Sequence, residues 1–456
     1  MLNTNRNILI IGAGRSGISM AKYLDAADKN AVLTDIKSYK DLCKDGYGIE
    51  EAANLKNIRT IFGRQPSAEE VENSSFIVLS PGVPTDIAPL KTAAEKGIKV
   101  ISEIEFADSV YKGSIIAVTG TNGKTTTTTL TGELLKAAGF EAYTAGNIGD
   151  PFINYADKSE DSVTALEIGS FQLDETEGLH PKIAVITNIT PDHLDRHLTM
   201  ENYINAKAKV FSEMGEDDYL ILNYDDENVR NLAERAGCRV LFFTVTGNEN
   251  LNAYLSSDMI TLSVDGIKTE LLHRREMKLI GLHNCANVMC AALAAYVYGA
   301  DPQIIAGTVR NFEPVEHRVE FVAEKNGIKY INDSKGTNPE ATMTAVNAVE
   351  DGGIVLILGG YDKHSEFDEL FELISRKVRH CVILGDTKVK LLQAADKAGY
   401  TELTMVDDYE HAVKRCSQIA REGEYVLLSP ACASWDMFEN YEQRGKYFKE
   451  LVHSLK

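Results

Sequence analysis

Residues Val118–Thr127 read VTGTNGKTTT and follow a short apolar run, Ile115–Val118. Such a run is typical of a strand that is buried on both faces, and a helical pattern over Thr128–Ala138 comes next. Glycines let a backbone wrap around a phosphate, and the N–H groups at a helix start point toward it. We therefore predict a P-loop that opens an α/β nucleotide-binding domain. The alternative is an ordinary strand-to-helix turn without a ligand.

This loop also carries a cation and a hydroxyl where a nucleoside triphosphate needs them. Lys124 would neutralise the β- and γ-phosphates, and the Thr125 hydroxyl would bind Mg²⁺. The sequence departs from the strict pattern at one position, because Val118 stands where that pattern has glycine. The residues of this loop that we predict to bind ATP are Gly120, Thr121, Asn122, Gly123, Lys124, Thr125 and Thr126.

Short apolar runs alternate with helical patterns along the chain, which predicts βα units and mostly parallel sheets. The clearest other runs are Ile8–Ile11, Phe76–Leu79, Ile183–Ile186, Ile354–Leu358, Val382–Leu384 and Val426–Leu428. Helical patterns cover Asn284–Gly299 and Asp301–Asn311, and a hairpin signal separates Arg318–Ala323 from Ile328–Asn332. We predict an α/β protein of three segments, 1–106, 107–313 and 314–456.

The composition limits the possible partners and the compartment. The chain has 456 residues and a formal net charge of -20, so its surface would repel nucleic acid and anionic lipid. Its seven cysteines are scattered and form no CxxC pair, which indicates reduced thiols rather than a disulfide framework or a zinc site. Because no apolar stretch reaches about 18 residues, we expect a cytoplasmic protein without membrane insertion.

A second glycine-rich turn lies near the N-terminus. Gly12–Gly17 reads GAGRSG, a GxGxxG pattern between a predicted strand and a predicted helix, and Asp35 ends the next strand. The pattern indicates a phosphate-binding turn but does not identify the nucleotide. A nicotinamide dinucleotide site and a tight turn without a ligand both remain open on spacing alone.

Further polar groups follow other strands of the central segment. Glu167 stands at the end of a strand, where an oxygen ligand for Mg²⁺ is well placed beside a P-loop. His193 lies in a loop between two carboxylates, with a structural surface histidine as the alternative. Lys207 lies on a predicted helix, and its position alone predicts a solvated lysine without a role.

Three polar clusters follow strands of the third segment. They are Asn332–Asn338 (NDSKGTN), 359–363 (GGYDK) and 429–436 (SPACASWD). Open α/β sheets bind ligands at the carboxyl ends of their strands. Each cluster alone could be a turn, but three at one predicted edge favour a binding face.

Taken together, the chain resembles the Mur ligase family along essentially its whole length. The matching strings are VTGTNGKTTT, GNIG (146–149), EIGSFQLD, NITPDHLDRH, GLHNCANVMCA, EHRVE, INDSKGTNPEA, LILGGYDK and LLSPACASWDMFENYEQRG. GNIG, SFQL and the last string are similar to the branch that adds D-glutamate to UDP-N-acetylmuramoyl-L-alanine. The resemblance implies an ATP-dependent ligase of peptidoglycan precursor synthesis that works through an acyl phosphate.

The resemblance also implies a fold and cofactors. We expect a Rossmann-like UDP-substrate domain, a central P-loop ATPase domain with a mostly parallel sheet, and a Rossmann-like amino-acid-binding domain. ATP and two Mg²⁺ ions would act together, and Lys207 would carry a carbamate close to the second ion. We expect a monomer.

Residue roles carried over by resemblance fall into five groups. The UDP substrate would lie among Gly14, Ser16, Asp35, Ser80 and Asn147. Asn287, Arg318 and Asp333 would contact ATP, and Thr125, Glu167, His193 and Lys207 would serve the metal ions. Thr337, Lys363, Ser434 and Tyr441 would form the D-glutamate pocket, while Lys124, His193 and Lys207 would be catalytic. Gly169 departs from the family, where a serine is usual.

Three alternatives compete with this interpretation. Another Mur ligase or a folylpolyglutamate synthetase would share the P-loop and the histidine loop but differ in the substrate domains. A nicotinamide-dependent oxidoreductase would explain the first glycine-rich turn but not the P-loop. A nucleotide-binding regulator without catalysis would tolerate the loss of Lys124.

Overall fold

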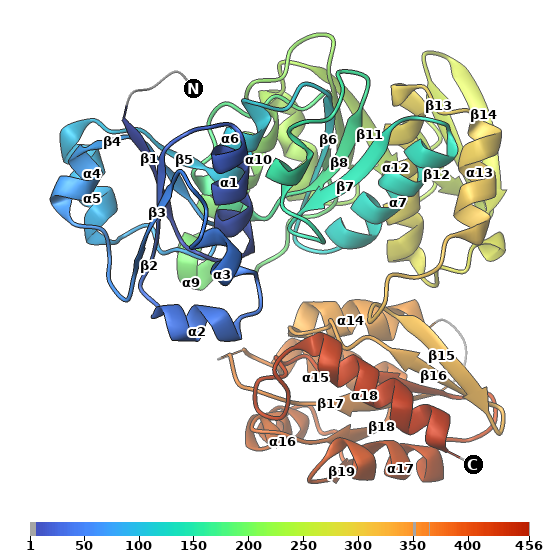
Figure 1. Cartoon of the computed structure of the whole chain (residues 1–456). Coiled ribbons are helices and arrows are strands. Elements are labelled where there is room, and N and C mark those ends of the chain that lie inside the picture. The colour runs from blue at the N-terminus through green and yellow to red at the C-terminus, as the bar shows by residue number, and fades with distance from the viewer. Residues whose placement is uncertain (1–5, 350–352, 364, 456) are drawn as a thin grey trace. The chain divides into compact units, whose positions relative to one another are not determined.

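A computed structural model of the protein describes residues 6–349, 353–363 and 365–455, with the side chain of Asp195 excepted. Within these residues the strands form three sheets, each with its own helices (Figure 1). The predicted three-domain α/β fold is therefore confirmed. Contacts group the chain into two units, Met1–His273 with Ala286–Val309 and Arg274–Cys285 with Arg310–Lys456, which we describe separately. The domain limits at residues 106 and 313 stay predictions.

The N-terminal sheet is parallel, with the strand order β3-β2-β1-β4-β5. Helices α1 and α6 pack on one face and α4 and α5 on the other (Figure 1). The strands are β1 (Asn7–Ile11), β2 (Ala31–Asp35), β3 (Ile58–Phe62), β4 (Ser74–Leu79) and β5 (Val100–Ser102). The helices are α1 (Arg15–Ala26), α2 (Tyr39–Lys44), α3 (Ile49–Ala52), α4 (Ala68–Glu72), α5 (Ala88–Lys96) and α6 (Glu103–Asp108).

The central sheet has the order β14-β13-β12-β11-β10-β9-β6-β8-β7. It is parallel from β7 to β12, and antiparallel β13 and β14 extend one edge. Its strands are β6 (Ser114–Thr119), β7 (Ala142–Gly146), β8 (Val163–Glu167), β9 (Ile183–Ile186), β10 (Tyr219–Asn223), β11 (Arg239–Thr244), β12 (Ala253–Ser256), β13 (Met259–Val264) and β14 (Ile267–His273).

The helices of the middle part of the chain include the one that follows the P-loop. They are α7 (Lys124–Ala137), α8 (Ser170–Asp174), α9 (Leu194–His197), α10 (Met200–Ala208), α11 (Glu227–Arg230), α12 (Leu282–Tyr298) and α13 (Pro302–Asn311). Helix α7 begins at Lys124, four residues before the predicted start at Thr128. Gly123, with φ of 84°, turns the chain directly into the helix.

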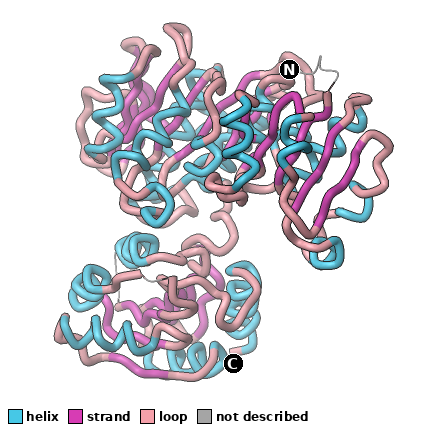
Figure 2. The backbone as a smooth tube through the Cα atoms, turned by 90° about the vertical axis from the view of Figure 1, so that its left-hand side faces the viewer, coloured by secondary structure: helices cyan, strands magenta, loops and turns pink. Residues whose placement is uncertain are grey.

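The C-terminal sheet has the order β15-β16-β20-β17-β18-β19, and β15 is its antiparallel edge. Strands run through its middle with helices around them (Figure 2). The strands are β15 (Glu320–Lys325), β16 (Ile328–Asn332), β17 (Ile354–Leu358), β18 (Val378–Ile383), β19 (Leu403–Met405) and β20 (Tyr425–Leu428). The helices are α14 (Pro339–Ala348), α15 (Asp368–Lys377), α16 (Lys388–Lys397), α17 (Tyr409–Ile419) and α18 (Tyr441–Ser454).

The strand order brings the predicted central groups together. β6 lies between β8 and β9, and all three run parallel. The P-loop, Glu167 and the segment after β9 therefore meet at one sheet edge, as the carboxyl ends of parallel strands must. Among the residues that the structure describes, no helix has both the length and the apolar character needed to cross a bilayer.

Candidate functional site

The P-loop connects the end of β6 to the start of α7, and two of its glycines are required by close approaches. A Cβ atom on Gly120, where φ is 144°, would lie 2.0 Å from the Thr187 hydroxyl oxygen. A Cβ on Gly123 would lie 2.3 Å from the side-chain oxygen of Asn287. Larger residues at these positions would force the loop to move. The backbone amides at the start of α7 are thus held where an anion can approach them.

Two lysines converge on the carbonyl oxygen of Gly120. Lys124 Nζ donates to it at 2.9 Å and also to the Thr121 carbonyl at 2.7 Å. Lys207 Nζ, from helix α10, donates to the same Gly120 oxygen at 2.8 Å. A site with two cations beside a glycine-rich loop suits a polyanionic ligand.

Lys207 is not the solvated lysine that its helical position predicts. It is 1% exposed, and its ammonium nitrogen lies 4.6 Å from the centre of the Tyr203 ring. Burial, and secondarily the positive charge of Lys124, hold the pKa of Lys207 well below its ordinary value. The group is therefore pushed toward the neutral, nucleophilic amine.

Asn287 contacts the P-loop from helix α12. It is buried, and its side-chain oxygen accepts a hydrogen bond from the Thr127 hydroxyl at 3.4 Å. The structure thus brings a residue predicted from the resemblance to within contact of Gly123, 164 positions earlier in the sequence. This contact lies within one unit, so it belongs to the described site.

Glu167 ends β8 with one carboxylate oxygen satisfied and the other not. Asn147 Nδ2 donates to Oε1 at 2.9 Å, and the Asn147 N–H donates to the Glu167 carbonyl. Oε2 is buried without a hydrogen-bond partner in the described residues. A buried carboxylate oxygen of this kind is costly unless something binds it, and a divalent cation would suit it. The residues present therefore fit Mg²⁺.

Two further predicted metal ligands, His193 and Thr125, have less support from their surroundings than Glu167 has. His193 is exposed, has φ of 53°, and lies with Nε2 3.5 Å from the Asp192 carboxylate. Its ring packs edge-on against Phe171. Thr125 is buried in the first turn of α7. In the described part of the chain, no three His, Cys, Asp or Glu side chains gather as a metal cluster.

The N-terminal domain contains a cavity of about 630 Å³ at its glycine-rich turn. Gly14, Ser16, Asp35 and Ser80 line it, as the resemblance implies. The Asp35 carboxylate accepts from the Ala13 N–H at 2.8 Å and so closes the turn. Asn147, predicted for the same substrate, is not among the described residues that line this cavity, and its side chain donates a hydrogen bond to Glu167 of the central domain.

Among the residues of this cavity that sequence reasoning missed are Arg15, Tyr47 and Arg64. Arg15 lies over the Tyr47 ring and donates to the Gly149 carbonyl at 2.8 Å, which links the turn to the GNIG string. The basic residue inside the GxGxxG pattern was the available signal. Arg15, Lys37 and Arg64 line the cavity together with Asp35 and Asp45. Lys37 pairs with Asp45, and Arg64 pairs with Glu70.

In the second unit, Arg318 is flanked by two residues with positive φ, His317 (67°) and Val319 (43°). Asp333 is buried and accepts from the Val319 N–H and from the Ser429 hydroxyl, the latter at 2.6 Å. Burial raises the pKa of Asp333 to about 7. The Val319–Asp333 hydrogen bond therefore ties the segment around Arg318, which precedes β15, to Asp333, which follows β16.

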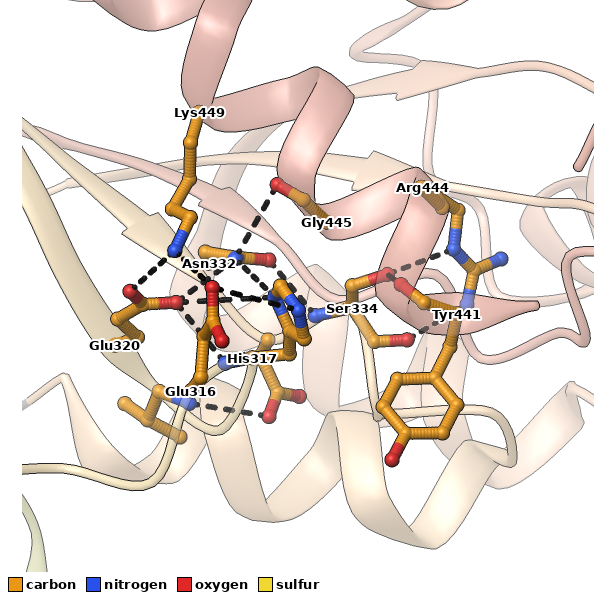
Figure 3. A network of polar contacts seen from close by, with 11 residues as sticks. Glu316, His317, Glu320, Asn332, Ser334, Tyr441, Arg444, Gly445 and Lys449 are labelled. Atoms are coloured by element: carbon orange, nitrogen blue, oxygen red, sulfur yellow. Dashed lines mark hydrogen bonds and ion pairs between the residues drawn. The ribbon is translucent and has the colours of Figure 1, made fainter.

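A polar network fixes that segment (Figure 3). The buried His317 ring contacts Asn332 Nδ2 at 2.9 Å, and Glu320 accepts from the His317 N–H. Lys449 of α18 binds Glu316 and Glu320. Because a Cβ on Gly445 would lie 2.3 Å from the His317 ring, helix α18 packs directly on it.

The predicted amino-acid pocket is distributed over loops at the carboxyl ends of β16, β17 and β20. Tyr441 begins α18, and its carbonyl accepts from the Ser334 hydroxyl, three residues before Thr337. Ser434 is buried, and neighbouring Ala433 pairs with Tyr361, close to the exposed Lys363. The four residues follow three neighbouring parallel strands, in the order β16-β20-β17. Their common role stays a prediction.

Arg444 supports these loops and was not foreseen. Its side chain is fully buried and donates to the hydroxyl and carbonyl of Ser334 (Figure 3). It also donates to the Cys432 carbonyl. The arginine in the string ENYEQRG was its only sequence signal.

Comparison with known proteins covers all three domains. The chain matches the Mur ligase MurD-like N-terminal domain over residues 6–102, the Mur ligase middle domain over 118–295 and the Mur ligase glutamate ligase domain over 317–432. The UDP-N-acetylmuramoylalanine--D-glutamate ligase of Thermoanaerobacter sp. (strain X514) is 45% identical over 455 residues, 99% of each chain. The same-named ligase of Clostridioides difficile (strain 630) is 41% identical over 453 residues, again 99% of each.

Solved structures agree with this fold. MurC of Thermotoga maritima, a UDP-N-acetylmuramate-alanine ligase, superposes with a TM-score of 0.61 at 17% identity, covering 99% of this chain and 100% of that one. MurF ligase of Thermotoga maritima gives a TM-score of 0.62 at 18% identity over 93% of this chain and 95% of that one. On its three matched domains and full-length relatives, the chain belongs to the Mur ligase family.

Proposed function

We propose that this protein is the cytoplasmic, ATP-dependent ligase that adds D-glutamate to UDP-N-acetylmuramoyl-L-alanine in peptidoglycan precursor synthesis. The observation that carries the proposal is the P-loop with two lysines on the Gly120 carbonyl, within a chain 45% identical over 99% of its length to a ligase of that name. We further propose that it acts as a monomer, with substrate, ATP and amino-acid domains at 1–106, 107–313 and 314–456.

The P-loop would bind ATP through Gly120, Thr121, Asn122, Gly123, Lys124, Thr125 and Thr126. Asn287 supports the assignment because it contacts this loop. Arg318 and Asp333 would contact the same nucleotide. Mg²⁺, when bound, would offset the negative charges of the phosphates and the acceptor. Glu167 would hold one ion, since its Oε2 is buried without a partner in the described residues, and Thr125, His193 and Lys207 would complete two sites.

Lys207 would act as a carbamate. A neutral lysine amine attacks the carbon of CO₂, a nitrogen–carbon bond forms, and one N–H proton leaves. The burial that lowers the pKa of Lys207 favours the neutral amine that this step needs. The product is an anion, which suits a divalent cation. Replacing Lys207 by alanine should nearly abolish turnover, and short carboxylates should partly restore it. Wild-type turnover in that variant would contradict the carbamate.

The cavity of the N-terminal domain would hold the UDP part of the substrate, with Gly14, Ser16, Asp35 and Ser80 at its wall. Asn147 would reach the substrate from its position on Glu167. Thr337, Lys363, Ser434 and Tyr441 would bind D-glutamate. Gly169 leaves the usual serine contact to the neighbouring Ser170 or to water.

The reaction would proceed in two steps. An oxygen of the alanine carboxylate attacks the γ-phosphorus, the bond to the β–γ bridging oxygen breaks, and ADP leaves. The neutral amine of D-glutamate then attacks the acyl carbon, phosphate leaves with the former carboxylate oxygen, and the amine loses a proton. Lys124 would neutralise charge in the first step, and closure of the domains would protect the acyl phosphate from water.

The test is ADP release from purified protein with Mg²⁺, UDP-N-acetylmuramoyl-L-alanine and a panel of D- and L-amino acids. We expect release only with D-glutamate. Release that requires L-glutamate and a folate would contradict the proposal, and so would NAD(P) binding without ATP binding. Full function in a Lys124→Ala variant would favour a non-catalytic nucleotide-binding regulator.

A further inference from the structure

The chain segment that follows β9 lies behind the P-loop and holds its backbone. The Thr121 N–H donates to the Asn188 carbonyl at 2.8 Å, and the Asn122 N–H donates to the Asn188 side-chain oxygen at 2.8 Å. The Asn122 carbonyl accepts from the Thr187 hydroxyl at 2.6 Å and from Asn188 Nδ2 at 3.0 Å. The Thr190 N–H donates to the Thr121 hydroxyl. The shape of residues 120–123 therefore depends on residues 187–190, which we call the backing segment.

The backing segment is itself held from the other side by Asn223, the last residue of strand β10, and by residues that follow it. Asn223 Nδ2 donates to the Thr187 carbonyl at 2.9 Å. The Ile189 N–H donates to Asp226 Oδ2 at 2.7 Å, and Asn228 Nδ2 donates to the Ile189 carbonyl at 3.1 Å. Ile189 is thus held at both its N–H and its carbonyl.

Asp226 also connects the backing segment to a helix. It is the N-cap of α11, where Oδ1 accepts from the Val229 N–H at 3.2 Å. One carboxylate therefore joins the start of a helix to the middle of the backing segment. A carboxylate held by its own helix is a more rigid support than a free side chain.

This arrangement matters because a glycine-rich loop has little rigidity of its own. Phosphate binding by backbone N–H groups requires those groups to be oriented before the ligand arrives, since ordering them on binding costs free energy. The backing segment also leads directly into the loop that carries His193. A support that holds Ile189 therefore acts on the nucleotide loop and on the histidine loop together.

We propose that Asp226, assisted by Asn228, is a positioning residue for nucleotide binding. It holds the backing segment and, through it, the P-loop in the shape that accepts phosphates. The inference rests on the proposed function only in taking that ligand to be an adenine nucleotide with Mg²⁺.

The neighbouring residue Asp225 provides a matched control. Its carboxylate accepts from the Thr244 hydroxyl at 2.5 Å, the Val245 N–H at 2.8 Å and the Thr246 hydroxyl at 3.1 Å. Its carboxylate thus accepts three hydrogen bonds where that of Asp226 accepts two, but from Thr244 at the end of β11 and the residues after it, and not from the backing segment. A purely structural role would affect both positions alike.

The experiment measures the dissociation constant of ADP with Mg²⁺ by calorimetry, and the urea midpoint, for full-length Asp226→Ala, Asp226→Asn and Asp225→Ala. Asp226→Ala should weaken ADP binding by about fivefold or more, the factor that corresponds to one hydrogen bond. Asp226→Asn should bind within about twofold of wild type, because its amide oxygen still accepts from Ile189. Asp225→Ala should lower the urea midpoint but also bind ADP within about twofold.

Unchanged ADP binding in Asp226→Ala, or equal losses in both alanine variants, would overturn the proposal. If Asp226→Ala does not fold, the exposed Asn228→Ala variant replaces it, with an expected loss of about twofold to fivefold. ADP binding is measured without any acceptor. A wild-type protein that binds ADP but does not ligate D-glutamate would therefore refute the proposed function while leaving the Asp226 comparison valid.

Discussion

Replacing Lys207 by methionine should separate stability from activity. The lysine is 1% exposed, its ammonium donates to the Gly120 carbonyl, and burial followed by the charge of Lys124 lowers its pKa. Methionine has a similar length and no charge. We therefore expect a variant that folds at least as well as wild type near neutral pH but loses turnover by about 100-fold or more, since the carbamate proposed to serve the metal ions cannot form on methionine.

The pH dependence of this difference follows from linkage. An unfolded lysine titrates near its ordinary pKa of 10.5, and the folded pKa lies well below that. Between the two values the unfolded chain binds one more proton than the folded chain, so stability rises with pH. The free-energy cost of burying the charged lysine applies in full below the folded pKa and is absent above the unfolded pKa. Wild type should therefore gain stability over the variant between about pH 8 and about pH 9.5, by at most about 1.4 kcal/mol per pH unit.

The assay is urea unfolding of both proteins at the two pH values in buffer freed of CO₂. ATP turnover is measured separately in buffer that contains bicarbonate. Lys136→Met, which removes a lysine of α7 that is 48% exposed, controls for the loss of one surface cation. Its stability should follow the wild-type pH profile. A Lys207→Met variant that also follows that profile, or that keeps wild-type turnover, would refute the reasoning.

Three further predictions concern the P-loop, a buried carboxyl and the metal. Gly120→Ala should weaken ADP binding, measured by calorimetry, by about tenfold or more, because its Cβ would lie 2.0 Å from the Thr187 hydroxyl; unchanged affinity would count against the loop geometry. Burial raises the pKa of Glu103 from 4.5 to about 7. Between these two pH values the folded state binds one more proton than the unfolded state, so wild type loses stability as the pH rises. Glu103→Gln should gain up to about 3 kcal/mol over wild type between about pH 5 and about pH 8 in urea unfolding, and parallel profiles would contradict this. Glu167→Gln should raise the Mg²⁺ concentration for half-maximal turnover by about tenfold, and a chelator should stop wild-type turnover until Mg²⁺ is restored; an unaltered Mg²⁺ dependence would exclude Glu167 as a ligand.

Much of the fold was predictable because its central strands are buried on both faces. The runs at Ile115–Val118 and Ile354–Leu358 are apolar without alternation, and both became central strands of parallel sheets. The start of α7 was harder, since the threonines after Lys124 are β-branched and weak helix formers. The antiparallel strands β13 and β14 mix polar with apolar residues, and no prediction covered them.

Site residues could be predicted where a local sequence pattern indicates their role. They could not be predicted where the role depends on contacts between residues that are distant in the sequence. Gly123 and Lys124 carry their role in a local pattern. The role of Lys207 cannot be inferred in this way, because its buried ammonium contacts the Gly120 carbonyl, 87 residues earlier in the sequence. The contact of Asn147 with Glu167 likewise arises only when β7 and β8 pair. Local spacing cannot report such contacts.

The central claim is that the terminal phosphoryl of ATP passes to a carboxylate oxygen of the acceptor. It is tested most directly by turnover with UDP-N-acetylmuramoyl-L-alanine labelled with ¹⁸O in its free carboxylate, followed by mass spectrometry of the products. The account predicts one ¹⁸O atom in each released phosphate and none in the ADP. Unlabelled phosphate, or label recovered in AMP, would contradict it.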